Sequence, residues 1–153
     1  MKKIIAALSI ITAALVAPLH AADQNATLTK VTITFTTHND NKDHDTVLNV
    51  LIKNKVSMFL SQDLASGDNL GGDMEFVDPS THPFDLVLKS DKVTLKDITL
   101  PVVNIHIQPH GKDRWIFDYK VSLIFSDGST FSSTKTGIIL DQDNKDYTGV
   151  FEG

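Results

Sequence analysis

Large apolar residues occupy every second position from Trp115 to Phe125, and this run constrains the fold of the chain more than any other feature. The positions in between include Asp118, Lys120 and Ser122. Successive side chains of a β-strand point to opposite faces, so the run predicts a strand with one face in a core and one in solvent. Shorter stretches with the same alternation occupy residues 28–37, 46–53, 84–88 and 103–108.

Turn-forming sequences separate these stretches. Asp127-Gly128 predicts a tight hairpin, and the apolar phase changes at Lys96-Asp97, which predicts a turn or a bulge. The glycine-rich stretch 61–73 is expected to be a long surface loop, and the apolar residues near it are candidates for an exposed tip: Leu64, Leu70 and Phe76. About eight short strands divided by turns predict an all-β fold, a single antiparallel β-sandwich.

The first residues are typical of a secretory signal peptide. Lys2 and Lys3 precede an apolar run over residues 4–16, and small residues follow at Ala21 and Ala22. We expect cleavage after Ala21 or Ala22, so that residues 1–21 form the signal peptide and residues 22–153 form one β-sandwich domain. An uncleaved membrane anchor is the alternative, but the apolar run is short for a membrane span. The expected location is secreted or periplasmic.

Charge and cysteine content exclude several classes of function. The chain has 14 Lys and Arg residues against 19 Asp and Glu residues, and without Lys2 and Lys3 the net charge falls from -5 to -7. Such a chain is a poor nucleic-acid binder and is repelled by a bare anionic membrane. It has no cysteine, which excludes disulfides and thiol catalysis.

An acidic loop at residues 38–46 lies between the first two predicted strands. It contains Asp40, Asp43 and Asp45 together with two asparagines. Aspartate and asparagine favour turns, so a solvated acidic turn is one interpretation. Their oxygens are also the ligands that calcium prefers. The spacing does not match a twelve-residue calcium loop, so a calcium site would need a second loop, and Asp113 is the expected donor from it.

Other chemistry has less support in the sequence. His106 and His110 stand four residues apart, a spacing that aligns zinc ligands on a helix but not on a predicted strand. There is no nucleophile elbow, metalloprotease motif or phosphate-binding glycine loop, so a non-catalytic protein is expected. Trp115 is either a membrane or ligand anchor or a core residue, and its place in the alternating face favours the core.

With these residues in view, the chain resembles a PLAT (polycystin–lipoxygenase–alpha-toxin) domain, roughly from Leu28 to Ser133. The stretches that carry the resemblance are VTITFTT, HNDNKDH, DTVLNVLI and KDITLPVVNIHIQPHGKDRWIFD. It implies a calcium-ligating aspartate at Asp45 with Asp43 beside it, and a second loop ligand at Asp113. The chain departs from the family pattern at Asp43-His44, where the family has Gly-Thr, and at Arg114, which separates Asp113 from Trp115.

The resemblance implies calcium-assisted binding to a lipid surface or a protein partner. Calcium held by Asp40, Asp43, Asp45 and Asp113 is therefore the expected cofactor, with the calcium-loop end as the contacting surface. The alternatives are a carbohydrate-binding or adhesin module with structural calcium, and an uncharacterised hydrolase. Fold alone does not choose among these functions.

Overall fold

The computed structural model describes residues 21–152. The predicted signal peptide, apart from Ala21, lies outside the described residues. Within residues 21–152 no helix is long and apolar enough to cross a membrane. The elements, in chain order, are β1 (Leu28–Thr37), β2 (Val47–Lys55), β3 (Ser61–Gly67), β4 (Ser80–Leu88), the 3-10 turn η1 (Leu95–Asp97), β5 (Pro101–Gln108), β6 (Arg114–Phe125), β7 (Thr130–Asp141) and β8 (Asp146–Val150).

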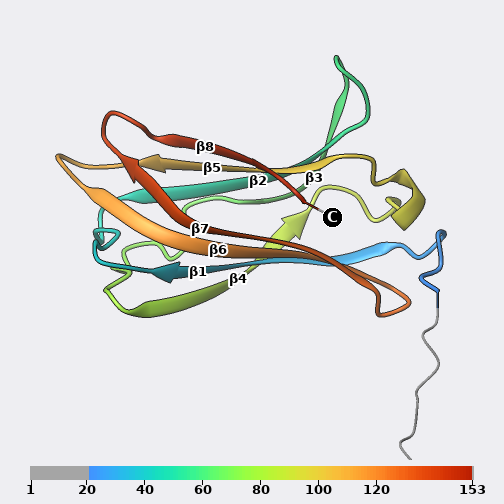
Figure 1. Ribbon diagram of the computed structural model, residues 1–153, viewed down its shortest axis with the longest axis horizontal. Helices are drawn as coiled ribbons and strands as arrows, with labels where there is room; N and C mark the ends of the chain where they lie inside the picture. Colours follow the sequence, from blue (N-terminus) through green and yellow to red (C-terminus); the bar gives the residue numbers. More distant parts are fainter. Residues whose placement is uncertain (1–20, 153) are drawn as a thin grey trace, which may run out of the picture.

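The eight strands pair in the order β7-β6-β1-β4-β3-β2-β5-β8, and all seven pairings are antiparallel. The ladder folds over on itself at β4, which pairs with β1 along most of its length and with β3 through Val87 and Leu88. Figure 1 shows the two resulting layers, with β7, β6, β1 and β4 in one and β3, β2, β5 and β8 in the other. The predicted class, a single antiparallel β-sandwich of about eight strands, is confirmed.

The alternating run 115–125 forms β6, the central strand of its layer. Its buried residues share one hydrophobic core with the buried residues of β2 and β5, and Trp115 is fully buried, so it is a core residue. The strand β7, which is rich in serine and threonine, lies at the edge of the sheet. Its pairing shifts between Phe117 and Tyr119, where Gly137 has φ 68° and donates its N–H to Asp118 at 2.8 Å.

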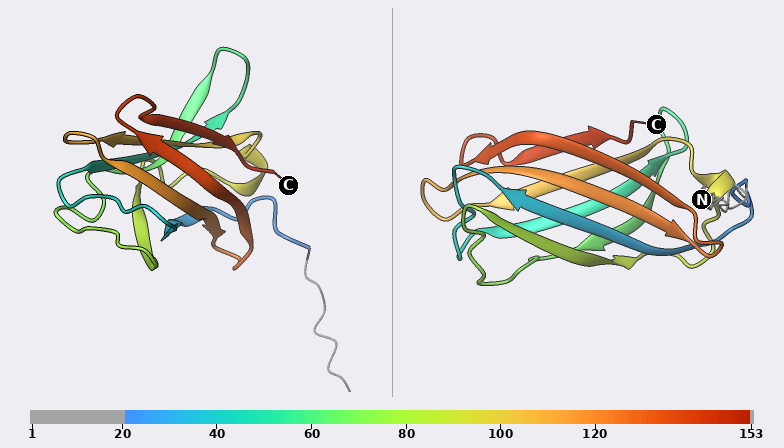
Figure 2. Two further views of the ribbon diagram at one scale, coloured as in Figure 1. Left: turned by 60° about the vertical axis from the view of Figure 1, so that its left-hand side comes forward. Right: turned by 60° about the horizontal axis from the view of Figure 1, so that its bottom comes forward.

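Two expectations for residues 53–76 are wrong. The stretch expected to be a long surface loop begins with a strand, β3, and the three residues proposed as an exposed apolar tip, Leu64, Leu70 and Phe76, are buried. The β3 strand fills the space between β2 and β4, which carries Leu64 and Ala65 into the core. The exposed tip belongs instead to residues 56–60, which join β2 to β3 and rise away from both layers (Figure 2).

Aromatic rings gather in the core beneath one end of the sandwich. Trp115 stacks on Phe117 with ring centroids 3.9 Å apart, and its edge meets Phe76 at 5.7 Å. Phe35 packs against both Trp115 and Phe117. The indole N–H of Trp115 donates to the Thr37 hydroxyl at 3.0 Å, at the end of β1 where the acidic loop begins. This aromatic cluster therefore forms a well-packed base beneath the acidic loop.

Because Tyr119 packs closely against β8, we expect that Gly149 cannot be replaced by a larger residue without loss of stability. A Cβ added at Gly149 would meet the Tyr119 hydroxyl and would lie 2.9 Å from the Tyr147 ring. Gly149→Ala is therefore expected to lower the free energy of unfolding by about 1–3 kcal/mol, measured by urea denaturation. Because the Tyr119 hydroxyl is buried and has no hydrogen-bond partner among residues 21–152, Tyr119→Phe should leave stability unchanged or raise it. It should also recover part of the loss in the double variant. Equal stability of Gly149→Ala and the wild type would contradict this packing.

Candidate functional site

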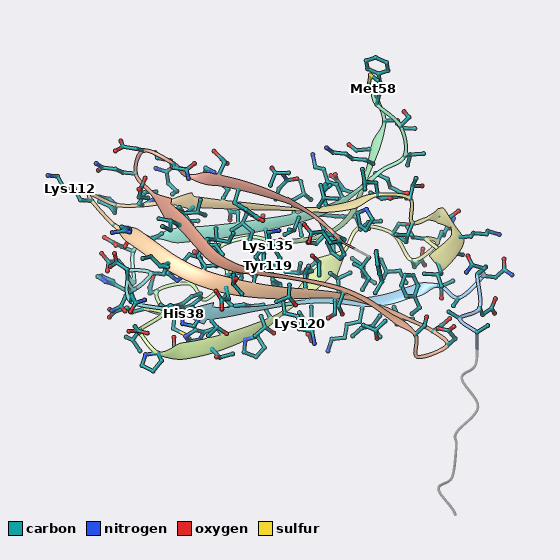
Figure 3. All side chains as sticks on the ribbon, in the orientation of Figure 1. His38, Met58, Lys112, Tyr119, Lys120 and Lys135 are labelled. Atoms are coloured by element: carbon teal, nitrogen blue, oxygen red, sulfur yellow. The ribbon has the colours of Figure 1, made fainter. Side chains whose placement is uncertain are left out.

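The acidic loop, residues 38–46, joins β1 to β2 at one end of the sandwich. The β5–β6 loop, residues 109–113, lies at the same end, as Figure 1 shows and as the label on Lys112 marks in Figure 3. The antiparallel order of the strands brings these two connections together. Asn39 adopts φ 62°, the left-handed conformation that asparagine tolerates, and this turns the chain as it leaves β1.

Asp113 joins the two loops. Its carboxylate is buried, and it accepts hydrogen bonds from the Thr46 hydroxyl and from the backbone N–H of Asp43 at 3.3 Å. A buried carboxylate needs such donors, because an unpaired one would carry a large desolvation cost. The prediction that Asp113 meets the acidic loop therefore agrees with its position, although the contacts are hydrogen bonds to Thr46 and to the backbone.

Lys42 is a second, unanticipated anchor of the acidic loop. Its side chain is fully buried, which is rare for lysine. The ammonium donates to the backbone carbonyls of Asp43 at 3.0 Å and Met74 at 3.1 Å, and it lies 4.8 Å from the centroid of the Phe76 ring. Burial lowers the pKa of Lys42, while the nearby carboxylates, first Asp113 and then Asp43, oppose that shift.

A shallow depression of about 470 Å³ opens between the two loops. Three of the four predicted aspartates line it: Asp40, Asp43 and Asp113. Asn39 and Asn41 add amide groups, and two basic residues, Lys112 and Arg114, complete the rim. The nearest approach of the Arg114 guanidinium to Asp40 is 3.8 Å, so one carboxylate already has a partial counter-charge.

The carboxylates of this end repel one another. The pKa of Asp43 is raised, first by desolvation and then by the negative charges of Asp113 and Asp45. The negative charge of Asp45 contributes to this repulsion, but the residue does not line the depression. The structure thus brings Asp40, Asp43 and Asp113 together and leaves Asp45 on the outside of the loop.

The carboxylates share a depression without converging on one point. Across residues 21–152, no group of three or more acidic or histidine side chains is arranged to hold a metal ion. Two of the histidines have local carboxylate partners. His38 lies 2.8 Å from Asp118, and His106 lies 2.7 Å from Asp146.

Comparison with solved structures adds a structural likeness. No model of a known protein family matches the chain, and no curated protein matches it. Among solved structures, the alpha toxin from Clostridium absonum is similar over 81% of the chain, with 19% sequence identity and a TM-score of 0.45. The chain spans 34% of the length of that protein. The assignment of the fold class rests on the strand order and packing described above.

Because the Lys42 ammonium is buried and hydrogen-bonded, we expect its removal to destabilise the protein. Lys42→Met would leave the carbonyls of Asp43 and Met74 without this donor and would remove a positive charge that interacts with the buried carboxylate of Asp113. We expect the free energy of unfolding to fall by about 1–3 kcal/mol. Urea denaturation near neutral pH measures this, with Lys89→Met, at an exposed position, as the control. An equal effect of the two substitutions would contradict the anchoring role.

The same residue predicts a pH dependence. Because the pKa of Lys42 is lower in the folded protein than the ordinary 10.5, the unfolded chain binds more protons between the two values. The wild type therefore gains stability from Lys42 as the pH rises through that window. The stability difference between the wild type and Lys42→Met should widen toward alkaline pH. A constant difference would show that folding leaves the pKa of Lys42 unchanged, and a narrowing difference would show that folding raises it; either result would contradict the lowered pKa.

Proposed function

We propose that this protein is an exported, non-catalytic β-sandwich that binds calcium at the depression between the acidic loop and the β5–β6 loop. It uses that end to engage an anionic lipid surface or a protein partner. The observation that carries the proposal is that Asp43 and Asp113, 70 positions apart in the chain, meet at one depression. The resemblance of the same stretches to a PLAT domain supports it.

The donor chemistry of the depression suits calcium. Carboxylates of Asp40, Asp43 and Asp113, with the amide oxygens of Asn39 and Asn41, offer the hard oxygen ligands that this ion takes. The pKa of Asp43 is raised first by desolvation and then by the negative charges of Asp113 and Asp45, and a bound cation would relieve that repulsion. Asp45 lies outside the depression and would act through its charge on Asp43.

Two features oppose tight binding. Asp40 lies near Arg114, and the Lys112 and Arg114 side chains add positive charge to the rim. Binding would have to separate Asp40 from Arg114 and bring the carboxylates closer together than they lie. We therefore expect an affinity in the range of extracellular modules, on the order of 10⁻⁴–10⁻³ M.

A bound calcium ion would supply positive charge and open coordination positions to a phosphate or carboxylate on the target surface. Lys112 and Arg114 stand on the same rim, so they would face the same anionic group. Asp113 would keep both loops in register through its hydrogen bonds to Thr46 and Asp43. The contact surface would thus change from acidic to basic on calcium binding.

Calcium should raise the melting temperature of the wild type in a concentration-dependent way. At about 100 times the dissociation constant the expected gain is about 2.7 kcal/mol, which a domain of this size shows as a shift of several degrees. Asp43→Asn should lose most of this shift and should be slightly more stable than the wild type without calcium, because it removes charge from a repelling group. Asp43 is exposed, so the variant should fold.

The controls separate calcium binding from general salt effects. Magnesium at matched ionic strength should produce a smaller shift, and Asp91→Asn, an exposed substitution outside the depression, should keep the full response to calcium. Equal responses to calcium and magnesium in the wild type would leave a solvated acidic turn as the correct interpretation. Calcium stabilisation without any calcium-dependent binding to phosphatidylserine vesicles or to a protein would indicate a structural ion, as the carbohydrate-module alternative requires.

A further inference from the structure

The connection between β2 and β3 ends in an exposed apolar tip, residues 56–60 with the sequence VSMFL. Met58 is 89% exposed, Phe59 is 95% exposed and Leu60 is 60% exposed. Figure 3 places the label of Met58 at the top of this projection, at the opposite end of the molecule from Lys112 and the acidic depression. These side chains are not part of the core. Three adjacent large apolar residues at an exposed tip indicate a contact with another molecule.

The tip is held in a defined shape. The N–H groups of Val56 and Ser57 both donate to the carbonyl of Leu60, at 2.9 and 3.1 Å. The hydroxyl of Ser57 accepts the N–H of Phe59 at 3.4 Å. These bonds close the chain tightly at the turn and direct the side chains of Met58 and Phe59 outward.

The base of the hairpin is braced against the body of the sandwich by Asn54, whose side chain is fully buried. Its amide oxygen accepts the N–H groups of Thr99 and Leu100 at 2.9 and 3.1 Å, and its amide nitrogen donates to the carbonyl of Asp97 at 2.7 Å. The N–H of Lys55 donates to the carbonyl of Leu100 at 2.9 Å. The hairpin is therefore fixed at its base and presents its tip to solvent.

Three lysines lie beside the apolar tip, so this surface is locally basic although the chain as a whole is acidic. Lys55 lines the depression of about 510 Å³ beside Met58, Phe59 and Leu60. Lys92 and Lys96 line the adjoining depression beneath Val56, where Asp97 is the one acidic residue among the lining side chains of the two depressions. Asp97 is held by the N–H and hydroxyl of Thr94. The apolar tip suits the apolar interior of a bilayer, and the lysines beside it suit the anionic headgroups.

We propose that residues 56–60 insert into an anionic lipid bilayer without calcium, as a membrane contact separate from the acidic depression. A narrow projecting tip meets a fluid bilayer without needing a shaped pocket, whereas a protein partner would need a matching cavity. Phe59, Met58 and Leu60 enter the acyl boundary, and Lys55, Lys92 and Lys96 contact the headgroups. The opposite, acidic end then faces away from the bilayer.

Co-sedimentation with vesicles of equal parts phosphatidylcholine and phosphatidylglycerol, in EDTA, tests the proposal. The wild type should bind, and Phe59→Ser should reduce the partition coefficient by about tenfold or more, because burying one phenylalanine side chain contributes at least that factor. Val87→Ser is the matched control, since Val87 is an exposed apolar residue on β4 away from the tip. It should bind like the wild type, and both variants should keep the wild-type melting temperature.

A second variant reports insertion directly. Phe59→Trp should show a blue shift in its emission on addition of vesicles and quenching by brominated acyl chains, whereas the buried Trp115 of the wild type should show neither. Pure phosphatidylcholine should weaken binding several-fold. Failure of the wild type to bind in EDTA, or equal binding by Phe59→Ser, would overturn the proposal. Because these measurements exclude calcium, their outcome is independent of the proposed calcium site, which is tested by melting.

Discussion

The hydrogen bonds of the buried Asp113 carboxylate define one end of the molecule. Asp113 lies just before β6, and its partners, Thr46 and Asp43, lie just before β2. These strands belong to different layers of the sandwich, so the Asp113 side chain adds hydrogen bonds between the layers at the end where the acidic loop also connects them. The buried ammonium of Lys42 fixes the same loop to residues 74–76 from the other side. The arrangement of the acidic depression depends on these two charged groups.

The two ends of the sandwich have opposite surface chemistry. The acidic depression gathers carboxylates whose mutual repulsion is only partly relieved, whereas the β2–β3 hairpin presents apolar side chains beside lysines. The antiparallel strands place these features far apart along the longest axis, as the labels of Lys112 and Met58 show in Figure 3. Our two proposals therefore describe a molecule that contacts a bilayer at one end and exposes a calcium-dependent surface at the other.

The sequence predicted the fold class because period-two alternation is strong in β1, β2, β5 and β6. It did not predict β3, since Ser61–Gly67 is polar and glycine-containing and its burial does not alternate; its conformation is set by pairing with β2 and β4. All four site aspartates were predicted to meet; Asp40, Asp43 and Asp113 line one depression without converging on one point, and Asp45 lies outside it. Lys42 was missed because a lysine among aspartates is ordinarily solvated, and only the carbonyl of Met74, 32 residues away, shows its role. The exposed tip at residues 56–60 was not predicted, because Val56, Met58 and Leu60 continue the alternation of β2 in the sequence.

The most direct test of the calcium proposal is an amide chemical-shift map during calcium titration of the protein. We expect saturable chemical-shift changes concentrated in residues 39–46 and 111–114. The largest should occur at Asp43, whose N–H already contacts Asp113. The amides of residues 56–60 at the opposite end should stay unchanged. Shifts that are absent at millimolar calcium, or that are spread evenly over the acidic surface, would contradict a calcium site in this depression.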